Sequence, residues 1–188
     1  TFQNLYSLGV STSSAASDDF FGMMDPQEGN MISQDKLDIA VGRILADTPE
    51  LGKIWVDKII GYEDAESYGS WRNNFVLISD DADESGSGGY GLQVQLDALG
   101  DDISANKPFI NVKKIHSDAY EQVSSSGGFR YPQVNEEIAN AVEVGTSVIN
   151  YLGHGNENGL ASERLVTIQD IESWQNENKY NLFITVTC

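Results

Sequence analysis

The sequence Thr146-Ser-Val-Ile-Asn-Tyr-Leu152 runs directly into Gly153-His154-Gly155, and a second apolar run, Asn181-Leu-Phe-Ile-Thr-Val-Thr-Cys188, ends on the only cysteine of the chain. Both runs are apolar and rich in β-branched residues, which predicts two buried strands. In a parallel sheet the carboxyl ends of neighbouring strands meet at one edge, where open α/β proteins build their sites. The two runs therefore predict an imidazole and a thiol at the same edge of a sheet.

The segments around these two runs alternate between strand and helix patterns. Asn74–Ser79 and Asn111–Ile115 are apolar enough for further strands, and residues 92–99 have helical periodicity. Pro132 begins a helix whose apolar face is formed by Val134, Ile138, Ala141 and Val142. This order predicts an α/β fold, with a mostly parallel sheet flanked by helices and joined by right-handed crossovers.

The first part of the chain has weaker patterns. Residues 1–35 are expected to be rich in loops, and Leu37–Gly42 alternates weakly, as a short strand would. Thr48 and Pro49 predict the start of a helix, because threonine caps a helix and proline favours its first position. The Gly-Ser step after residue 68 is the expected boundary between two subdomains.

The charge of the chain is strongly acidic. It has 11 basic and 29 acidic residues, for a net charge of −18, which argues against a nucleic-acid partner because binding phosphate needs clustered lysine and arginine. A solvating surface, calcium sites and a saline environment would each explain the acidity. The sequence has no apolar run long enough to span a membrane and no visible signal peptide at Thr1. We expect it to be a piece of a longer protein.

His154 and Cys188 form the candidate catalytic pair. An imidazole lowers the pKa of a nearby thiol by pairing with the thiolate, which is the nucleophile of cysteine peptidases. The backbone amides of Gly155 and Cys188 are candidates for stabilising the oxyanion. The alternative for Cys188 is a small core residue at the end of an apolar strand. The glycines beside His154 are expected to allow a sharp turn and a close approach to substrate.

Acidic residues follow the strand at 74–79. Asp80 and Asp81 would lie at the same edge as His154, and either could orient the imidazole, with Asp81 slightly favoured. The alternative is an exposed acidic turn or a cation site. His116 is the other candidate base, although it has no flanking glycines. The acidic residues between Asp18 and Glu28 could bind calcium, although the EF-hand pattern is not present.

Several motifs together resemble the gingipain-type, caspase-like cysteine peptidases. These motifs are Asp38-Ile-Ala-Val-Gly42-Arg43-Ile44, Trp71-Arg72-Asn73-Asn74, Ser126-Gly-Gly-Phe-Arg130-Tyr-Pro132, Asn150-Tyr-Leu-Gly153-His154-Gly155 and Val186-Thr187-Cys188. The resemblance implies that residues 1–69 are the C-terminal part of a first subdomain. Residues 70–188 would then be the N-terminal part of a caspase-like catalytic subdomain that ends at the nucleophile.

The same resemblance implies functional roles. Cys188, His154 and Asp81 would be the catalytic residues, no cofactor would be required for the chemistry, and structural calcium would be compatible with it. Within the family, the motifs are most similar to the sortases of the type IX secretion system. Such enzymes remove C-terminal sorting domains from secreted cargo proteins and transfer the cargo to anionic lipopolysaccharide. Their partners would include other secretion-system components, at the outer membrane and cell surface of a Bacteroidetes-type bacterium.

Two other functions compete with the sortase hypothesis. One is a general degradative protease of the gingipain kind, and the other is a non-catalytic, caspase-like scaffold or calcium-binding surface module. The aspartate of the arginine-specific pocket has no clear counterpart around residues 92–95. The sheet strands and pocket wall that the family places after the nucleophile would follow Cys188. We therefore expect little or no turnover from residues 1–188 by themselves.

Overall fold

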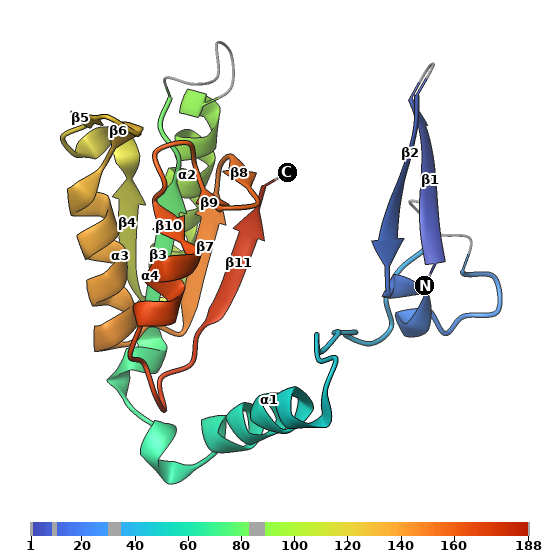
Figure 1. The fold of residues 1–188 in the computed structure, drawn as a ribbon. Coiled ribbons are helices and arrows are strands. Elements are labelled where there is room, and N and C mark those ends of the chain that lie inside the picture. The colour runs from blue at the N-terminus through green and yellow to red at the C-terminus, as the bar shows by residue number, and fades with distance from the viewer. Residues whose placement is uncertain (1, 9–10, 30–34, 83–88, 188) are drawn as a thin grey trace. The chain divides into compact units, whose positions relative to one another are not determined.

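The computed structural model describes residues 2–8, 11–29, 35–82 and 89–187 (Figure 1). The chain divides into two compact units, residues 1–57 and residues 58–188. In the described part of the chain, no helix combines the length and the apolar character that crossing a membrane would require.

The N-terminal unit contains a hairpin that the sequence did not predict. Strands β1 (Phe2–Leu8) and β2 (Ser11–Ser17) pair in antiparallel register, although residues 1–35 were expected to be rich in loops. A ladder joins main-chain groups, so a serine-rich strand can pair despite its turn-forming side chains. A single turn of 3-10 helix, η1 (Asp19–Gly22), follows, and Asp18 forms an ion pair with Arg43.

The strand expected at Leu37–Gly42 does not form. The main-chain N–H of Asp38 donates to Gly22 O at 2.8 Å, and its carboxylate accepts from the N–H of Met24 at 2.8 Å. These bonds hold the segment as an irregular connection. The next helix, α1 (Pro49–Tyr62), begins as predicted, because Thr48 Oγ1 accepts a hydrogen bond from Leu51 N–H at 3.2 Å.

The C-terminal unit contains a four-stranded parallel sheet in the order β11–β7–β3–β4. The strands are β3 (Asn74–Ser79), β4 (Asn111–His116), β7 (Val148–Leu152) and β11 (Leu182–Val186). All three pairings are parallel. The prediction of an α/β fold with a mostly parallel sheet flanked by helices is therefore confirmed, and so is the pairing of the two opening sequence runs.

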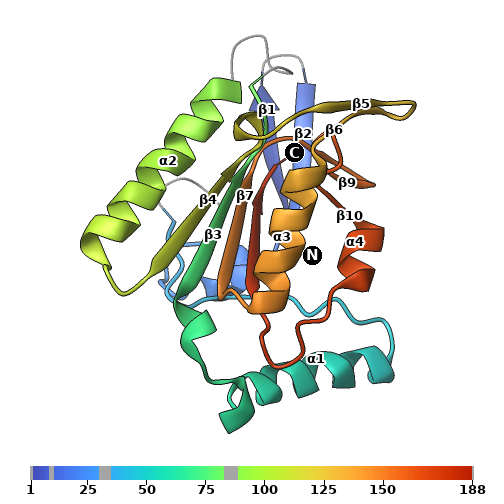
Figure 2. The same ribbon diagram turned by 90° about the vertical axis from the view of Figure 1, so that its left-hand side faces the viewer.

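Three helices connect the strands. They are α2 (Gly89–Asn106), α3 (Pro132–Val144) and α4 (Ile168–Ser173). Figure 2 shows α2 on one side of the sheet and α3 on the other. The predicted apolar face of α3 is buried against strand residues Val76, Ile78, Ile115 and Ile149. Thr167 forms a capping box with Asp170 at the start of α4.

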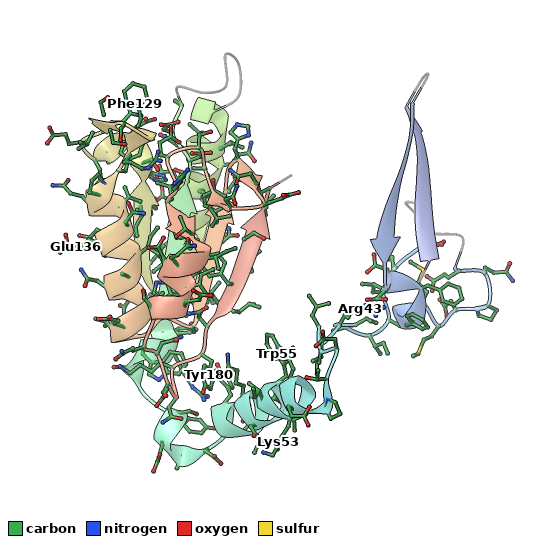
Figure 3. The ribbon with its side chains drawn as sticks, in the orientation of Figure 1. Arg43, Lys53, Trp55, Phe129, Glu136 and Tyr180 are labelled. Carbon is green, nitrogen blue, oxygen red and sulfur yellow. The ribbon has the colours of Figure 1, made fainter. Side chains whose placement is uncertain are left out.

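Short strands surround the carboxyl end of the parallel sheet. One hairpin pairs β5 (Val123–Ser125) with β6 (Gly128–Arg130), and Phe129 projects from it with 55% of its surface exposed (Figure 3). A small antiparallel sheet contains β8 (Gly155–Asn156), β9 (Gly159–Leu160) and β10 (Val166–Thr167). Single 3-10 turns η2 (Ala65–Ser67), η3 (Ser70–Asn73) and η4 (Ser117–Ala119) complete the unit.

The boundary expected between residues 69 and 70 concerns the subdomains of the whole catalytic region. The two compact units meet within α1 instead, between residues 57 and 58. Because compactness of this piece and the subdomain structure of a longer protein are different properties, the predicted subdomain assignment of residues 1–69 and 70–188 stays a prediction.

Candidate active site

The site forms where β3, β7 and β11 end. Leu152 lies opposite Ser79 in one ladder and opposite Val186 in the other, so the three strands end in register. Two hydrogen bonds extend the contact past these ends: Asp80 N–H donates to Leu152 O at 3.2 Å, and Gly153 N–H donates to Val186 O at 3.3 Å. The loops that follow the strands therefore start side by side, as the sequence predicted.

His154 is held through its main chain. Its N–H donates to Asp80 Oδ2 at 2.8 Å, and its carbonyl oxygen accepts from Tyr151 Oη at 2.6 Å and from Ala161 N–H at 2.9 Å. The side chain is half-buried. Among the residues that the structure describes, none forms a hydrogen bond with the imidazole. The ring nitrogens are thus left for an incoming group or for a neighbour outside the described residues.

The glycines beside His154 serve close packing. Neither Gly153 nor Gly155 has a positive φ, so the expected sharp turn does not explain them. A Cβ on Gly153 would lie 2.4 Å from Tyr151 Oη and 2.5 Å from the Cβ of Asp80. A Cβ on Gly155 would lie 2.6 Å from Thr187 Oγ1. Glycine at these two positions lets β3, β7 and the end of β11 come together around the histidine.

Asp80 is almost fully buried, with 1% of its surface exposed. Its Oδ1 accepts from the N–H of Asp81 at 3.0 Å, while its Oδ2 faces His154 and Tyr151. Burial raises the pKa of the Asp80 carboxyl, and this effect outweighs the N–H donors, which lower it. Burial, followed by the neighbouring Asp80 carboxyl, also raises the pKa of Tyr151, so the phenol stays protonated.

Asp81 points toward a different set of partners. It is also 1% exposed, and its Oδ2 accepts from Tyr131 Oη at 2.9 Å and from Gln122 Nε2 at 3.4 Å. These two donors flank the β5–β6 hairpin. Burial and the hydrogen bond to Asp81 raise the pKa of Tyr131. The structure thus brings Asp80 to the His154 segment and Asp81 to the base of the hairpin, and the predicted orienting role of Asp81 stays a prediction.

Glu163 is a buried acid that the sequence reasoning missed as a site residue. It is 5% exposed, and carboxylate oxygens of Asp80, Asp81 and Glu163 lie within 4.8 Å of one another. Such an all-oxygen donor set fits a hard cation such as calcium. Glu163 lies in the irregular loop between β9 and β10, where Ala161 and Arg164 have positive φ, so no periodic pattern marked it for burial.

Tyr151, Tyr131 and Gln122 were also missed. For Tyr151, the sequence did contain a signal: the alternation of β7 predicts that Ile149 and Tyr151 are both buried. A buried tyrosine needs a partner for its hydroxyl, and a strand end with two aspartates and a histidine is a ready source of one.

Cys188 and its backbone amide lie outside the described residues. The structure describes the residues before it: Val186 pairs with Leu152, and Thr187 packs against Gly155. In the sequence, Cys188 follows Val186 by two positions, as His154 follows Leu152. The roles of Cys188 and of the Gly155 amide therefore stay predictions.

His116 has a different environment. It is the last residue of β4, and its Nδ1 lies 2.7 Å from Oγ of the buried Ser79. Its Nε2 lies 3.8 Å from Asp97 Oδ1 on α2. The ring is engaged between the sheet and α2, which makes His116 a poor general base.

A cavity of about 520 Å³ lies at the opposite edge of the sheet. Its lining includes Asn74 and Asn111, at the amino ends of β3 and β4, and Val144, at the carboxyl end of α3. It contains none of the candidate catalytic residues. The cavity and the candidate active site therefore lie at opposite ends of the strands.

Comparisons with known proteins agree with this fold. The family model described as "Peptidase family C25" matches residues 1–188. The crystal structure of the Arg-specific cysteine proteinase gingipain R (RgpB) matches with a TM-score of 0.63 at 16% identity, over 92% of this chain and 35% of that chain. The search of curated proteins found no match. This likeness at low identity shows the fold, and the chain spans about a third of the gingipain chain.

The class that emerges is that of proteins with a gingipain-like α/β fold. Within this class, the chain belongs to peptidase family C25.

Proposed function

We propose that the protein is a cysteine endopeptidase in which Cys188 is the nucleophile and His154 is the base. One observation carries the proposal: β7 and β11 are adjacent, parallel and in register up to Leu152 and Val186. The close approach of Gly155 and Thr187 supports it, since it continues the contact past the strand ends, to three residues after Leu152 and one residue after Val186.

In the proposed reaction, His154 takes the thiol proton and the thiolate attacks the carbonyl carbon of the scissile peptide. The oxyanion would be bound by the amides of Gly155 and Cys188. His154 then returns the proton to the leaving amine, and the C–N bond breaks to leave a thioester on Cys188. Asp81 is the acid proposed to assist the histidine. No cofactor takes part in these steps.

The finer hypothesis is a sortase of the type IX secretion system, most similar to PorU. It is supported by the motifs around residues 126–136, 150–164 and 186–188. Such an enzyme would cleave C-terminal sorting domains from secreted cargo at the cell surface, and an amine of anionic lipopolysaccharide would resolve the thioester. Amines attack thioesters readily, so the same intermediate also serves transpeptidation.

The test uses a version of the protein that extends beyond Cys188, with and without Cys188→Ala, and a cargo protein that carries a C-terminal sorting domain. We expect the cargo to be cleaved only by the protein with the cysteine. Equal cleavage by both would refute the nucleophile, and no cleavage by either would favour a scaffold.

The chemical group at the new end of the cleaved cargo distinguishes a sortase from a degradative protease. Cargo that carries lipopolysaccharide at its new end supports the sortase, whereas free carboxylate ends support a degradative gingipain-like protease. We expect residues 1–188 alone to show little or no turnover, and robust cleavage by this piece would contradict the view that further chain completes the site.

A further inference from the structure

Two buried side chains bind the main chain of His154 from both sides. Asp80 accepts its N–H at 2.8 Å, and Tyr151 donates to its carbonyl oxygen at 2.6 Å. Asp80 is 1% exposed and Tyr151 is 0% exposed, so both bonds are shielded from water. Hydrogen bonds that involve a charged partner or a dry environment are stronger than exposed ones.

The two side chains also contact each other. Tyr151 Oη lies 3.3 Å from Asp80 Oδ2, and both pack where Gly153 has no side chain. The phenol has one proton to donate, and the shorter distance assigns that proton to the His154 carbonyl. Because the pKa of Tyr151 is raised, the hydroxyl keeps that proton throughout the neutral range.

We propose that Asp80 and Tyr151 are positioning residues that fix the main chain of His154 and thereby aim its imidazole, without using either ring nitrogen. This inference rests on the proposed function of His154 as a base. It adds a role for two residues that hold the histidine through its backbone rather than through its ring.

Such an arrangement suits a base that must both accept and return a proton. A partner on the ring favours one tautomer and occupies one nitrogen, whereas a partner on the peptide restricts position without using either nitrogen. Catalysis depends on this position, because misplacing a reacting group by about 1 Å can cost about 10²-fold in rate.

Both contacts can be removed with small changes. Tyr151→Phe deletes only the hydroxyl. Asp80→Asn keeps the shape, but both Asp80 oxygens accept main-chain N–H groups, so one of them would be replaced by an NH₂ that cannot accept. Tyr131→Phe is the matched control, because Tyr131 is also a buried tyrosine, and its hydroxyl donates to Asp81 rather than to His154.

The first experiment measures amide hydrogen exchange by NMR in the 188-residue chain. We expect exchange of the His154 amide, relative to that of the core residue Ile149, to be at least about tenfold faster in Asp80→Asn and in Tyr151→Phe, since each loses a bond that restrains the loop. Tyr131→Phe should leave this ratio near that of the wild type. The Ile149 reference separates a local release from a general loss of stability.

The imidazole signals give a second readout. The chain has only two histidines, so His154 and His116 give two sets of ring signals, and His116 is an internal reference. Asp80→Asn and Tyr151→Phe should both shift the His154 ring signals and leave those of His116 in place. Wild-type exchange ratios and wild-type His154 signals in Tyr151→Phe would overturn the proposal, as would equal changes in Tyr131→Phe.

The kinetic experiment uses the longer, active protein. Tyr151→Phe should lower kcat about tenfold with KM nearly unchanged, because the substrate still binds but the base is less well placed. A rise in KM with kcat unchanged would contradict the positioning role. If His154 is not the base, His154→Ala in the longer protein will keep its cleavage activity, whereas failure of the positioning role of Asp80 and Tyr151 shows in the exchange ratios.

Discussion

The two histidines of this chain lie at the ends of strands in one sheet and are held in opposite ways. At the end of β4, the ring of His116 is bonded to Ser79 and lies near Asp97. Beyond β7, the peptide of His154 is bonded and no described residue bonds its ring. From this difference we expect the ring of His116 to serve the structure and the ring of His154 to serve proton transfer.

The largest expected difference between the two histidines is in activity. In the longer protein, His154→Ala should lower kcat/KM by about 10²–10⁴-fold, the usual contribution of a general base. His116→Gln should cause no comparable loss, because its ring already serves the packing of α2 on the sheet. Steady-state cleavage of a cargo protein measures both. Equal losses would remove the distinction between the histidines.

A second prediction concerns the close packing beside His154. Gly153→Ala should destabilise the chain by about 2–3 kcal/mol, because the new methyl group would overlap Tyr151 and Asp80. The matched control is Gly91→Ala in α2, where a Cβ meets nothing within 4 Å. That change should stabilise by about 0.5–1 kcal/mol. Urea unfolding measures both, and a neutral Gly153→Ala would contradict the close approach.

The third prediction uses the pH dependence of stability. Asp80 has a raised pKa in the folded state, so the folded protein holds its proton more tightly than the unfolded chain does. Its contribution to the free energy of unfolding should therefore fall as the pH rises from about 4. Unfolding of the wild type and of Asp80→Asn between pH 4 and pH 7 should show this slope only in the wild type.

Asp97, near His116, provides a control, because its pKa is shifted in the opposite direction to that of Asp80. The hydrogen bond from Lys114 lowers the pKa of Asp97, so its contribution is present at neutral pH and is lost as the pH falls through the range below about 4. For Asp80 itself, the same dependence of stability on pH in Asp80→Asn and in the wild type would show that burial does not raise the pKa of its carboxyl.

The smallest expected effect is at His116. Ser79→Ala removes the hydroxyl bonded to His116 Nδ1 and should lower stability by about 1 kcal/mol. Cleavage by the longer protein should hardly change. Differential scanning calorimetry and the cargo assay test the two parts, and a large loss of activity would place His116 in the mechanism.

Much of the fold could be predicted because local patterns and tertiary packing agree in the C-terminal unit. The apolar run at Asn74–Ser79 is β3, and the apolar stripe on the helix after Pro132 is the buried face of α3. The pairing of β7 with β11 followed from their similar runs and the alternating order of elements. The β1–β2 hairpin was missed because it depends on main-chain pairing. The side chains of Ser11–Ser17 give no strand pattern from which that pairing could be predicted.

The site was predicted only in part, for a physical reason. Strand order and register bring the ends of β3 and β7 together, so Asp80, Asp81 and His154 could be placed at one edge. Which aspartate faces the histidine depends on side-chain direction after the strand ends, where the alternation no longer applies. Glu163 and Tyr131 join the site from a loop and a helix start, and only tertiary structure brings them there.

The most direct measurement of the central claim is the rate at which iodoacetamide alkylates Cys188, the only cysteine in the chain, at pH 6. If His154 stabilises the thiolate, the wild type and His116→Ala should react about tenfold faster than His154→Ala, because the thiolate is the reactive form. Equal rates for His154→Ala and the wild type would contradict the pairing of thiol and imidazole on which the proposed peptidase depends.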